Sequence, residues 1–278
     1  MTDGTTATRH EIARAKINLA LHVTGQRGDG YHLLDSLVCF ADFGDVLEVT
    51  PAPENSLTFD GPLAEGVPAG PENLVFRAAS FFGQPAAIRL TKHLPMAAGI
   101  GGGTADAAAV LRALSAATGR PVPENAERLG ADLPACLRSR ALRMQGVGER
   151  LEDVPGLPPL PAVLVNPGLG VETPAVFKRL TRRTNAALPA RLPDWPDAAS
   201  CAAWLSGQRN DLEAPARDIA PVIGDVLEAL AATPGCLLAR MSGSGATCFA
   251  LYPDLRAAEA AAASLAPIGW WARATTLS

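Results

Sequence analysis

The chain has 278 residues, of which 48% are apolar and 19% are charged. This composition supports a large core and excludes wholesale disorder, and the length corresponds to roughly two average domains. The net charge is −4 and only 5% of the residues are aromatic. With neither a basic excess nor many aromatic residues to stack bases, we expect no nucleic-acid partner.

Cysteine usage and the lack of long apolar runs point to the cytoplasm. The five cysteines are scattered and form no C-x-x-C pair, which argues against a zinc site and a disulfide framework and fits a reducing compartment. Residues 1–15 are polar, unlike a signal peptide, and no apolar run reaches the roughly 18 residues of a membrane span. We expect a cytoplasmic protein without a membrane partner. The oligomeric state stays open.

The first half of the chain predicts a mixture of strands and helices. Apolar and polar residues alternate in the first strand, which places Lys16 and Asn18 on one face. Residues 51–71 are rich in Pro, Gly and acidic residues and predict a loop. The predicted strands span 12–23, 45–50 and 87–92, and the predicted helices span 73–82, 105–118 and 124–129.

The second half predicts a smaller mixed domain. Four prolines between residues 155 and 161 mark a boundary, so we expect domains at 1–154 and 155–278. Strands and helices are mixed without strict alternation, which favours an α+β fold over a doubly wound sheet. The predicted strands span 162–165, 237–241 and 248–252, the predicted helices span 221–232 and 254–265, and a loop is predicted at 188–196.

A glycine-dense segment, residues 99–106, is the strongest chemical signal. It places four glycines in five positions, with Thr104 as the expected cap of the following helix. Glycines let backbone N–H groups approach an anion, and a helix start adds partial positive charge. We therefore favour phosphate binding over the alternative of a flexible turn, for which one glycine would be enough.

Three common glycine motifs do not describe this segment. No lysine follows the glycines, as the G-x-x-x-x-G-K-[ST] phosphate loop requires. Thr104 stands where a G-x-G-x-x-G dinucleotide loop has its third glycine. Residues 242–245 do not form the G-x-S-x-G turn of the hydrolases. The corresponding three enzyme classes are therefore disfavoured.

Residues 94–108 resemble the phosphate motif of the GHMP small-molecule kinases. Residues 15–19 resemble the first motif of that family and residues 242–247 its third, so the resemblance spans most of the chain. It implies a two-domain α+β fold with the active site in the cleft between the lobes. It also implies ATP-dependent phosphorylation of a small molecule.

Finer features are similar to the member of this family that acts on a cytidyl substrate; they are the segments 25–32, 130–134, 145–149 and 210–213. The implied reaction transfers the γ-phosphate of ATP to the 2-hydroxyl of 4-diphosphocytidyl-2-C-methyl-D-erythritol. Two alternatives are a GHMP kinase with a mevalonate-type or homoserine-type acceptor and a non-catalytic nucleotide-binding module. The Tyr31-His32 pair argues against the first, and the presence of both Lys16 and Asp132 argues against the second.

The resemblance implies that Asp132 is the catalytic base and Lys16 its electrostatic partner. Asp132 precedes Leu133-Pro134, which is equally typical of a helix N-cap. Lys16 is one of three lysines among 24 basic residues. Its alternative is a surface lysine whose stem packs on the strand.

The implied acceptor site comprises Asn18, Tyr31, His32 and Phe177. Asn18 would fix the reacting hydroxyl or Asp132, and its alternative is a hydrogen bond at a strand edge. Tyr31 and His32 would hold the cytosine, with Phe177 stacked on its other side. Surface turn residues and a core phenylalanine are the alternatives.

The implied ATP site is the loop, with Asn73 near the adenine and Lys92 reaching the nucleotide. Mg²⁺ is implied by phosphoryl transfer, without an evident protein ligand. Thr104-Ala105-Asp106 replaces the Ser-Ser-Asp usual in the family, so Ala105 lacks one hydroxyl, and Asp106 is expected to be an ordinary partner of the helix dipole. The loop residues implied are Pro95, Met96, Ala97, Ala98, Gly99, Ile100, Gly101, Gly102, Gly103 and Thr104.

Overall fold

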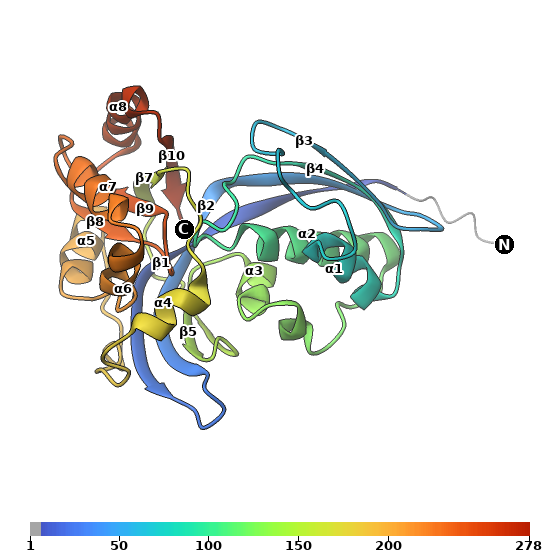
Figure 1. The fold of residues 1–278 in the computed structure, drawn as a ribbon, viewed down its shortest axis with the longest axis horizontal. Helices are drawn as coiled ribbons and strands as arrows, with labels where there is room; N and C mark the ends of the chain where they lie inside the picture. The colour runs from blue at the N-terminus through green and yellow to red at the C-terminus, as the bar shows by residue number, and fades with distance from the viewer. Residues whose placement is uncertain (1–6) are drawn as a thin grey trace. The chain divides into compact units, whose positions relative to one another are not determined.

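The computed structural model describes residues 7–278, so the first six residues of the predicted polar N-terminal segment lie outside the description. The fold is α+β, as predicted (Figure 1). Two compact units are present. Unit 1 comprises the residues up to Ala15, Phe43–Met96 and Gly101–Ser139, and unit 2 comprises Lys16–Asp42, Ala97–Ile100 and Arg140–Ser278. Both are discontinuous along the chain, and the domain boundary between residues 154 and 155 stays a prediction.

Unit 1 combines a small sheet with helices on one of its faces (Figure 1). The end of β2 (His32–Pro51) pairs antiparallel with β4 (Ala86–Thr91), and β3 (Ser56–Asp60) pairs parallel with β4. The helices are α1 (Leu74–Phe82), α2 (Gly102–Thr118), η1 (Ala126–Leu129) and α3 (Leu133–Arg138). The prediction that residues 51–71 form only a loop is wrong, because β3 lies within them. β3 is stabilised by pairing with a strand about thirty residues away, which local composition does not reveal.

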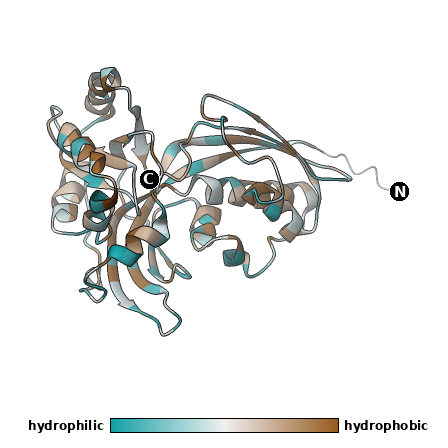
Figure 2. Ribbon diagram, viewed as in Figure 1, coloured by the Kyte–Doolittle hydropathy of each residue, from teal (hydrophilic) through white to brown (hydrophobic). Residues whose placement is uncertain are grey.

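Unit 2 is built around β7 (Leu160–Asn166), which pairs antiparallel with β10 (Trp271–Leu277) and β9 (Cys248–Leu251). β8 (Leu238–Met241) forms a hairpin with β9. β7 is buried on both faces, and apolar residues line these strands (Figure 2). The remaining elements are β5 (Leu142–Gly146), β6 (Arg150–Asp153), α4 (Thr173–Arg179), α5 (Ala198–Ser206), α6 (Glu213–Ile219), α7 (Val222–Ala231), α8 (Leu255–Leu265) and η2 (Ala266–Ile268).

Two elements are longer than predicted. β1 (Arg9–Gln26) extends beyond 12–23, and β2 begins at His32 instead of residue 45. β1 pairs with β2, and a Cβ at Gly44 would lie 1.9 Å from the Ala13 carbonyl oxygen. That close approach requires a glycine inside a strand, and glycine weakens a strand prediction.

The second half of the chain contains elements that were not predicted, namely β5, β6, β10 and α4–α6. These are short or marked by weak periodicity, and their stability comes from packing in unit 2. Within the described residues, no helix is both long enough and apolar enough to cross a membrane.

Candidate functional site

The first half of the glycine-rich loop is fixed through its carbonyl groups. The Ala97 oxygen accepts from Val171 N at 3.3 Å, the Ala98 oxygen from Thr247 N at 3.1 Å, and the Ile100 oxygen from Lys16 N at 2.9 Å. The Gly99 oxygen accepts from Ser242 Oγ at 3.3 Å. Four successive carbonyl groups are therefore bonded to other segments of unit 2, to which these residues belong, and this half of the loop has a defined backbone conformation.

The N–H groups of the same loop are left without protein partners. From Met96 to Thr104, no backbone N–H donates a hydrogen bond within the part of the chain that the structure describes. Ala97, Gly99 and Gly101 have positive φ angles of 49°, 74° and 68°. Alternating left-handed residues turn successive N–H groups toward a common side, which makes an anion-binding concavity. The loop thus offers what a polyphosphate requires.

The helix after the loop begins earlier than predicted. Gly101, with φ +68°, is the N-cap of α2, and no side chain makes a capping hydrogen bond there. The prediction of Thr104 as the cap is therefore wrong, because Gly102 and Gly103 already have helical geometry. The Thr104 side chain instead lies against Gly130, where an added Cβ would be 3.4 Å from Thr104 Oγ1. The loop and the segment that leads to Asp132 are thereby in contact.

The beginning of α2 contributes Asp106 to a buried ionic cluster. Lys92 Nζ contacts Asp45 Oδ2 and, at 2.9 Å, Asp106 Oδ2, and all three side chains are almost fully buried. Asp45 Oδ1 also accepts from His93 N at 2.6 Å and Leu94 N at 2.9 Å. Burial disfavours the charged forms, but the two carboxylates outweigh it and raise the pKa of Lys92.

Asp106 is therefore not the solvated partner of a helix dipole that we expected. It lies in the second turn of α2, where burial, opposed by Lys92 and assisted by Asp45, raises its pKa to about 8. Its Oδ1 has no hydrogen-bond partner. Lys92 is likewise buried and paired with two carboxylates. That Lys92 reaches ATP stays a prediction.

Asp132 occupies the N-cap position of α3 but makes no capping hydrogen bond with its side chain. Its φ and ψ of −82° and −8° are helical, whereas a capping residue has an extended backbone. An ordinary N-cap would therefore account for the position of Asp132 at the start of α3. It would not account for the orientation of its side chain, which makes no capping bond and is half-buried in unit 1.

Lys16 and Asn18 lie on β1 in unit 2, both buried. Lys16 is 4% exposed, which excludes the alternative of a surface lysine. Asn18 Nδ2 donates to Ser36 Oγ at 2.8 Å, and its backbone N–H donates to Ser242 Oγ at 3.1 Å. Asn18 Oδ1 has no hydrogen-bond partner, so this buried amide keeps one acceptor for a ligand.

The predicted cytosine-binding residues adopt an arrangement that the sequence did not indicate. His32 and Phe177 stack directly on each other, with ring centroids 4.6 Å apart and an interplanar angle of 21°. A base between them would require a separation of about 7 Å, twice the contact distance of carbon atoms. Tyr31 is 64% exposed. The burial of His32, aided by Arg183, lowers the pKa of His32, so its imidazole is neutral at pH 7.

The two outer residues of the predicted ATP site differ in character. Asn73 is the N-cap of α1: its Oδ1 accepts from Val75 N at 3.0 Å, and its Nδ2 donates to Pro68 O at 2.7 Å. Met96, next to the loop, is 44% exposed, which is high for a large apolar side chain. Within residues 7–278 no group of three or more His, Cys, Asp or Glu side chains could hold a metal ion.

Sequence reasoning missed Asp45 and gave Ser242 no individual role. Asp45 is an acidic residue on a strand that is otherwise largely buried, and a buried carboxylate requires a partner. Ser242 belongs to a segment that was recognised only as a glycine-rich motif. Neither signal identifies the partner, which lies 47 residues away for Asp45 and 224 for Ser242.

Comparisons with known proteins agree with this geometry. The family model of the GHMP kinases N-terminal domain matches residues 73–140, and that of the GHMP kinases C-terminal domain matches residues 185–268. A protein of Dinoroseobacter shibae named 4-diphosphocytidyl-2-C-methyl-D-erythritol kinase is 58% identical over 96% of this chain and 94% of its own length. One of the same name from Cereibacter sphaeroides is 60% identical over 94% and 96%.

Solved structures give the same result for the fold. A crystal structure of 4-(cytidine 5'-diphospho)-2C-methyl-D-erythritol kinase has a TM-score of 0.75 and 38% identity, covering 97% of this chain and 99% of that one. L. major mevalonate kinase in complex with R-mevalonate shares only the fold, with a TM-score of 0.65 and 16% identity over 100% and 99% of the two chains. The chain therefore belongs to the GHMP kinases, and within them to the family whose members are named 4-diphosphocytidyl-2-C-methyl-D-erythritol kinase.

Proposed function

We propose that this kinase transfers the γ-phosphate of ATP to the 2-hydroxyl of 4-diphosphocytidyl-2-C-methyl-D-erythritol, giving the 2-phosphate and ADP in non-mevalonate isoprenoid precursor synthesis. The observation that carries the proposal is identity of 58% and 60% to two kinases of that name over at least 94% of the chain. The partnerless N–H groups from Met96 to Thr104 fit the phosphates of ATP. Bound ATP supplies the phosphoryl group.

In this proposal Asp132 holds the proton of the attacking hydroxyl, and Lys16 keeps the Asp132 carboxylate ionised. The half-buried position of Asp132 directly before α3 supports this role. Mg²⁺ would accompany ATP, held by phosphate and water oxygens, since the described residues offer no cluster of ligands for it. Asn73 and Lys92 would contribute to the ATP site, the former at the adenine.

At the acceptor site, Asn18 would use its partnerless Oδ1 to accept from a substrate hydroxyl. Tyr31, His32 and Phe177 would hold the cytosine, with the base outside the His32–Phe177 stack because there is no space between the two rings. Four basic residues follow Phe177 and form no ion pair within the described chain: Lys178, Arg179, Arg182 and Arg183. An unneutralised basic segment beside the stack favours an anionic acceptor such as a diphosphocytidyl compound.

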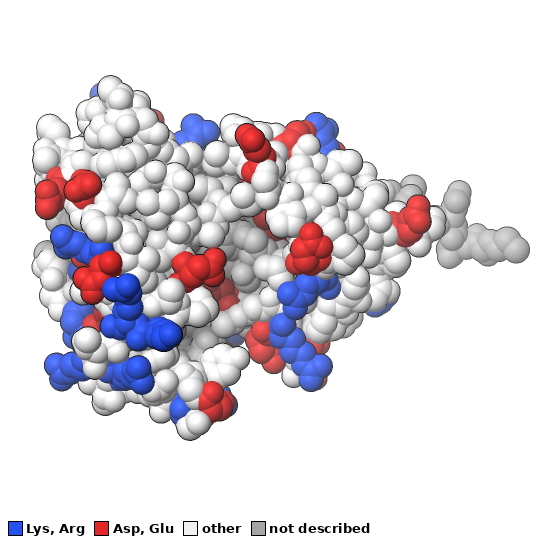
Figure 3. Space-filling view, viewed as in Figure 1, with Lys and Arg blue, Asp and Glu red and all other residues white. Residues whose placement is uncertain are grey.

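We also infer that the reaction takes place in the cytoplasm, because no disulfide joins any of the five cysteines in the described part of the chain, as in a reducing compartment. Figure 3 shows both acidic and basic side chains on one face, and the net charge of −4 gives no support to a nucleic-acid partner.

The function is tested by ADP release with Mg-ATP and four acceptors: the diphosphocytidyl methylerythritol, mevalonate, phosphomevalonate and homoserine. Turnover only with the cytidyl compound is expected. Turnover with another acceptor would contradict the proposed substrate, and ATP binding without any turnover would favour a non-catalytic module.

The roles of the two catalytic residues are tested by substitution. Asp132→Asn and Lys16→Met are each expected to keep ATP binding and to lose turnover by at least ~100-fold. Asp194→Asn, at an exposed aspartate of the 188–196 loop, is the matched control and should be fully active. Near wild-type turnover of Asp132→Asn would remove Asp132 from its proposed role.

A further inference from the structure

Residues 209–211 lie along β1 as a short added strand segment. Leu21 N donates to Arg209 O at 2.8 Å, Asp211 N donates to Leu21 O at 2.9 Å, and Val23 N donates to Asp211 Oδ2 at 2.7 Å. Leu21 and Asn210 form a parallel bridge. The position of Asn210 is thus set by the strand that carries Lys16 and Asn18.

The Asn210 side chain connects this segment to a distant loop. Its Nδ2 donates to Met241 O at 2.8 Å and to Gly243 O at 2.9 Å, while its Oδ1 accepts from Leu212 N at 3.0 Å. The side chain is almost fully buried. Only an amide carries two donors and an acceptor on one planar group of this size, so no other residue type reproduces these three bonds.

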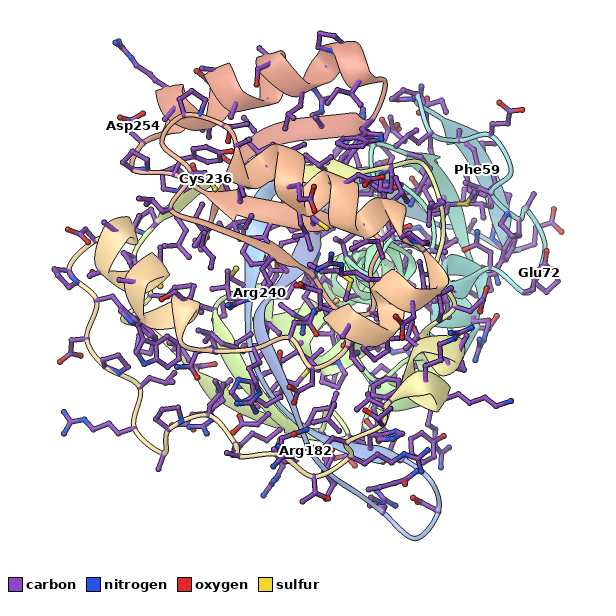
Figure 4. All side chains as sticks on the ribbon, turned by 60° about the vertical axis from the view of Figure 1, so that its left-hand side comes forward. Phe59, Glu72, Arg182, Cys236, Arg240 and Asp254 are labelled. Carbon is purple, nitrogen blue, oxygen red and sulfur yellow. The ribbon has the colours of Figure 1, made fainter. Side chains whose placement is uncertain are left out.

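Arg240 anchors the same loop from the adjacent position (Figure 4). It is buried and donates to the carbonyl oxygens of Leu19, Leu205 and Gln208 at 2.8 to 2.9 Å. The last two precede the 209–211 segment in the chain. The loop after β8 is therefore tied to β1 through two separate side chains, of which Asn210 holds the part nearest to the glycine-rich loop.

The part of the loop held by Asn210 contacts the glycine-rich loop directly. Ser242, between the two carbonyl groups that Asn210 binds, accepts from Asn18 N and donates to Gly99 O. A Cβ on Gly243 would lie 2.7 Å from Gly99 O, so the two backbones are in close contact. A shift of residues 241–243 would therefore move Gly99 and the N–H groups on either side of it.

We propose that Asn210 is a positioning residue for the nucleotide: it holds residues 241–243 so that Gly99 and the adjacent N–H donors keep the geometry that binds the ATP phosphates. Asn210 does not touch the nucleotide in this proposal. The inference rests on the proposed function only in taking ATP as the phosphoryl donor, and it does not depend on the acceptor. Loss of Asn210 should weaken nucleotide binding and raise the KM for ATP more than it lowers kcat.

The test is the binding of a non-hydrolysable ATP analogue with Mg²⁺, measured by isothermal titration calorimetry on the full chain. Asn210→Asp replaces the amide with a carboxylate that faces two carbonyl oxygens, and Asn210→Ala removes all three bonds. The analogue Kd is expected to rise by at least ~10-fold in both variants, since two lost hydrogen bonds correspond to about that factor. Asn185→Asp is the matched control, because Asn185 Nδ2 also donates to a backbone carbonyl, that of Val23, at 3.0 Å. It should lower Tm and leave the analogue Kd within twofold of wild type.

A pH series separates positioning from a general loss of structure. The ratio of the analogue Kd of Asn210→Asp to that of wild type should be smaller at pH 6 than at pH 8. The reason is that a protonated carboxyl can again donate a hydrogen bond to one carbonyl. Asn210→Ala should show no such recovery. The titratable and charged groups around this segment are the same in both variants: His22, whose pKa is lowered by burial, and Arg209, Asp211, Glu213 and Arg240.

The proposal is overturned if folded Asn210→Ala and Asn210→Asp bind the analogue within twofold of wild type, or if Asn185→Asp loses as much affinity as they do. If Asn210→Asp unfolds at pH 8, Asn210→Ser, which keeps one donor without a charge, provides the same comparison. A wild-type protein that binds the analogue but turns over no cytidyl acceptor would refute the proposed substrate and leave this test intact.

Discussion

The two halves of the glycine-rich loop are held by different kinds of interaction. Residues 97–100 belong to unit 2 and are fixed by hydrogen bonds between neutral groups, three from backbone N–H groups and one from Ser242. The start of α2 belongs to unit 1, where Asp106 is tied by Lys92 to Asp45. The hydrogen bonds of the neutral half depend little on pH, whereas the ionic half depends on three side chains and their protonation. The comparison indicates where substitutions should affect nucleotide binding and where they should affect stability.

The largest effect is expected from Lys92→Met in the ionic half. It leaves the buried Asp45 carboxylate, next to Asp106, without its counter-charge, which should lower the free energy of unfolding by about 3–5 kcal/mol. Urea unfolding measures the loss, with Lys178→Met at an exposed lysine as the control. Adding Asp106→Asn to Lys92→Met should restore part of the stability, because the new amide can donate a hydrogen bond to Asp45 in place of Lys92. Strictly additive losses would contradict a coupled cluster.

The next effect is expected from Gly99→Ala in the neutral half. A Cβ there would lie 2.6 Å from Gly245 O, on a backbone with φ +74°. Overpacking and the left-handed conformation together should cost about 2–4 kcal/mol, much of it seen as weaker binding of the ATP analogue. Gly119→Ala is the matched control, since Gly119 has φ +70° and open space around its Cβ. Equal losses in the two variants would mean that strain, and not the contact with Gly245, explains the effect.

A smaller effect is expected from Ser242→Ala. It removes the hydrogen bond to Gly99 O and leaves Asn18 N without its acceptor, which should cost about 1–2 kcal/mol. Calorimetric titration of the ATP analogue should register this as a weaker Kd. Ser206→Ala, at an exposed serine that donates to Ala203 O, should leave the Kd unchanged. An unchanged Kd in Ser242→Ala would show that the three backbone donors hold the loop by themselves.

The smallest effect, counted per pH unit, is a pH dependence of stability confined to the ionic half. Burial raises the pKa of Asp106 to about 8, whereas an unfolded aspartate titrates near 3.9. Between these values the folded protein holds a proton that the unfolded chain releases, so stability should fall as the pH rises, by at most about 1.4 kcal/mol per pH unit. Unfolding of wild type and Asp106→Asn between pH 5 and pH 8 should show a smaller slope in the variant. Parallel curves would mean that Asp106 stays ionised.

How much the sequence predicted differs between elements. Helices with strong periodicity or clear end signals were located well: α7 and α8 lie within a residue or two of their predicted bounds. β3, β10 and the first half of β2 were missed, because a strand is stabilised by partners that lie far away in the chain. The start of α2 was placed at Ala105 instead of Gly102, because glycines are read as helix breakers although a helix N-terminus accepts them.

Within the site, residue types were more predictable than their partners. Lys16 and Asn18 were singled out correctly as side chains on one buried face of a strand. Asp106 was misjudged, because its place near a helix start suggested a dipole partner and no local pattern indicates burial against Lys92. The direct stack of His32 on Phe177 likewise depends on how α4 packs in unit 2.

The sequence by itself determined the loop chemistry, since glycines at fixed positions and the helix that follows them are local features that create free N–H donors wherever the chain places them. It also determined the family, through three ordered motifs. The tertiary structure alone decided which groups hold that loop: Ser242 and Asn210 from one part of the chain, and Asp45 with Lys92 and Asp106 from another. The physical reason is that periodicity and capping act within a few residues, whereas a buried hydrogen bond or ion pair is specified only when distant segments pack together.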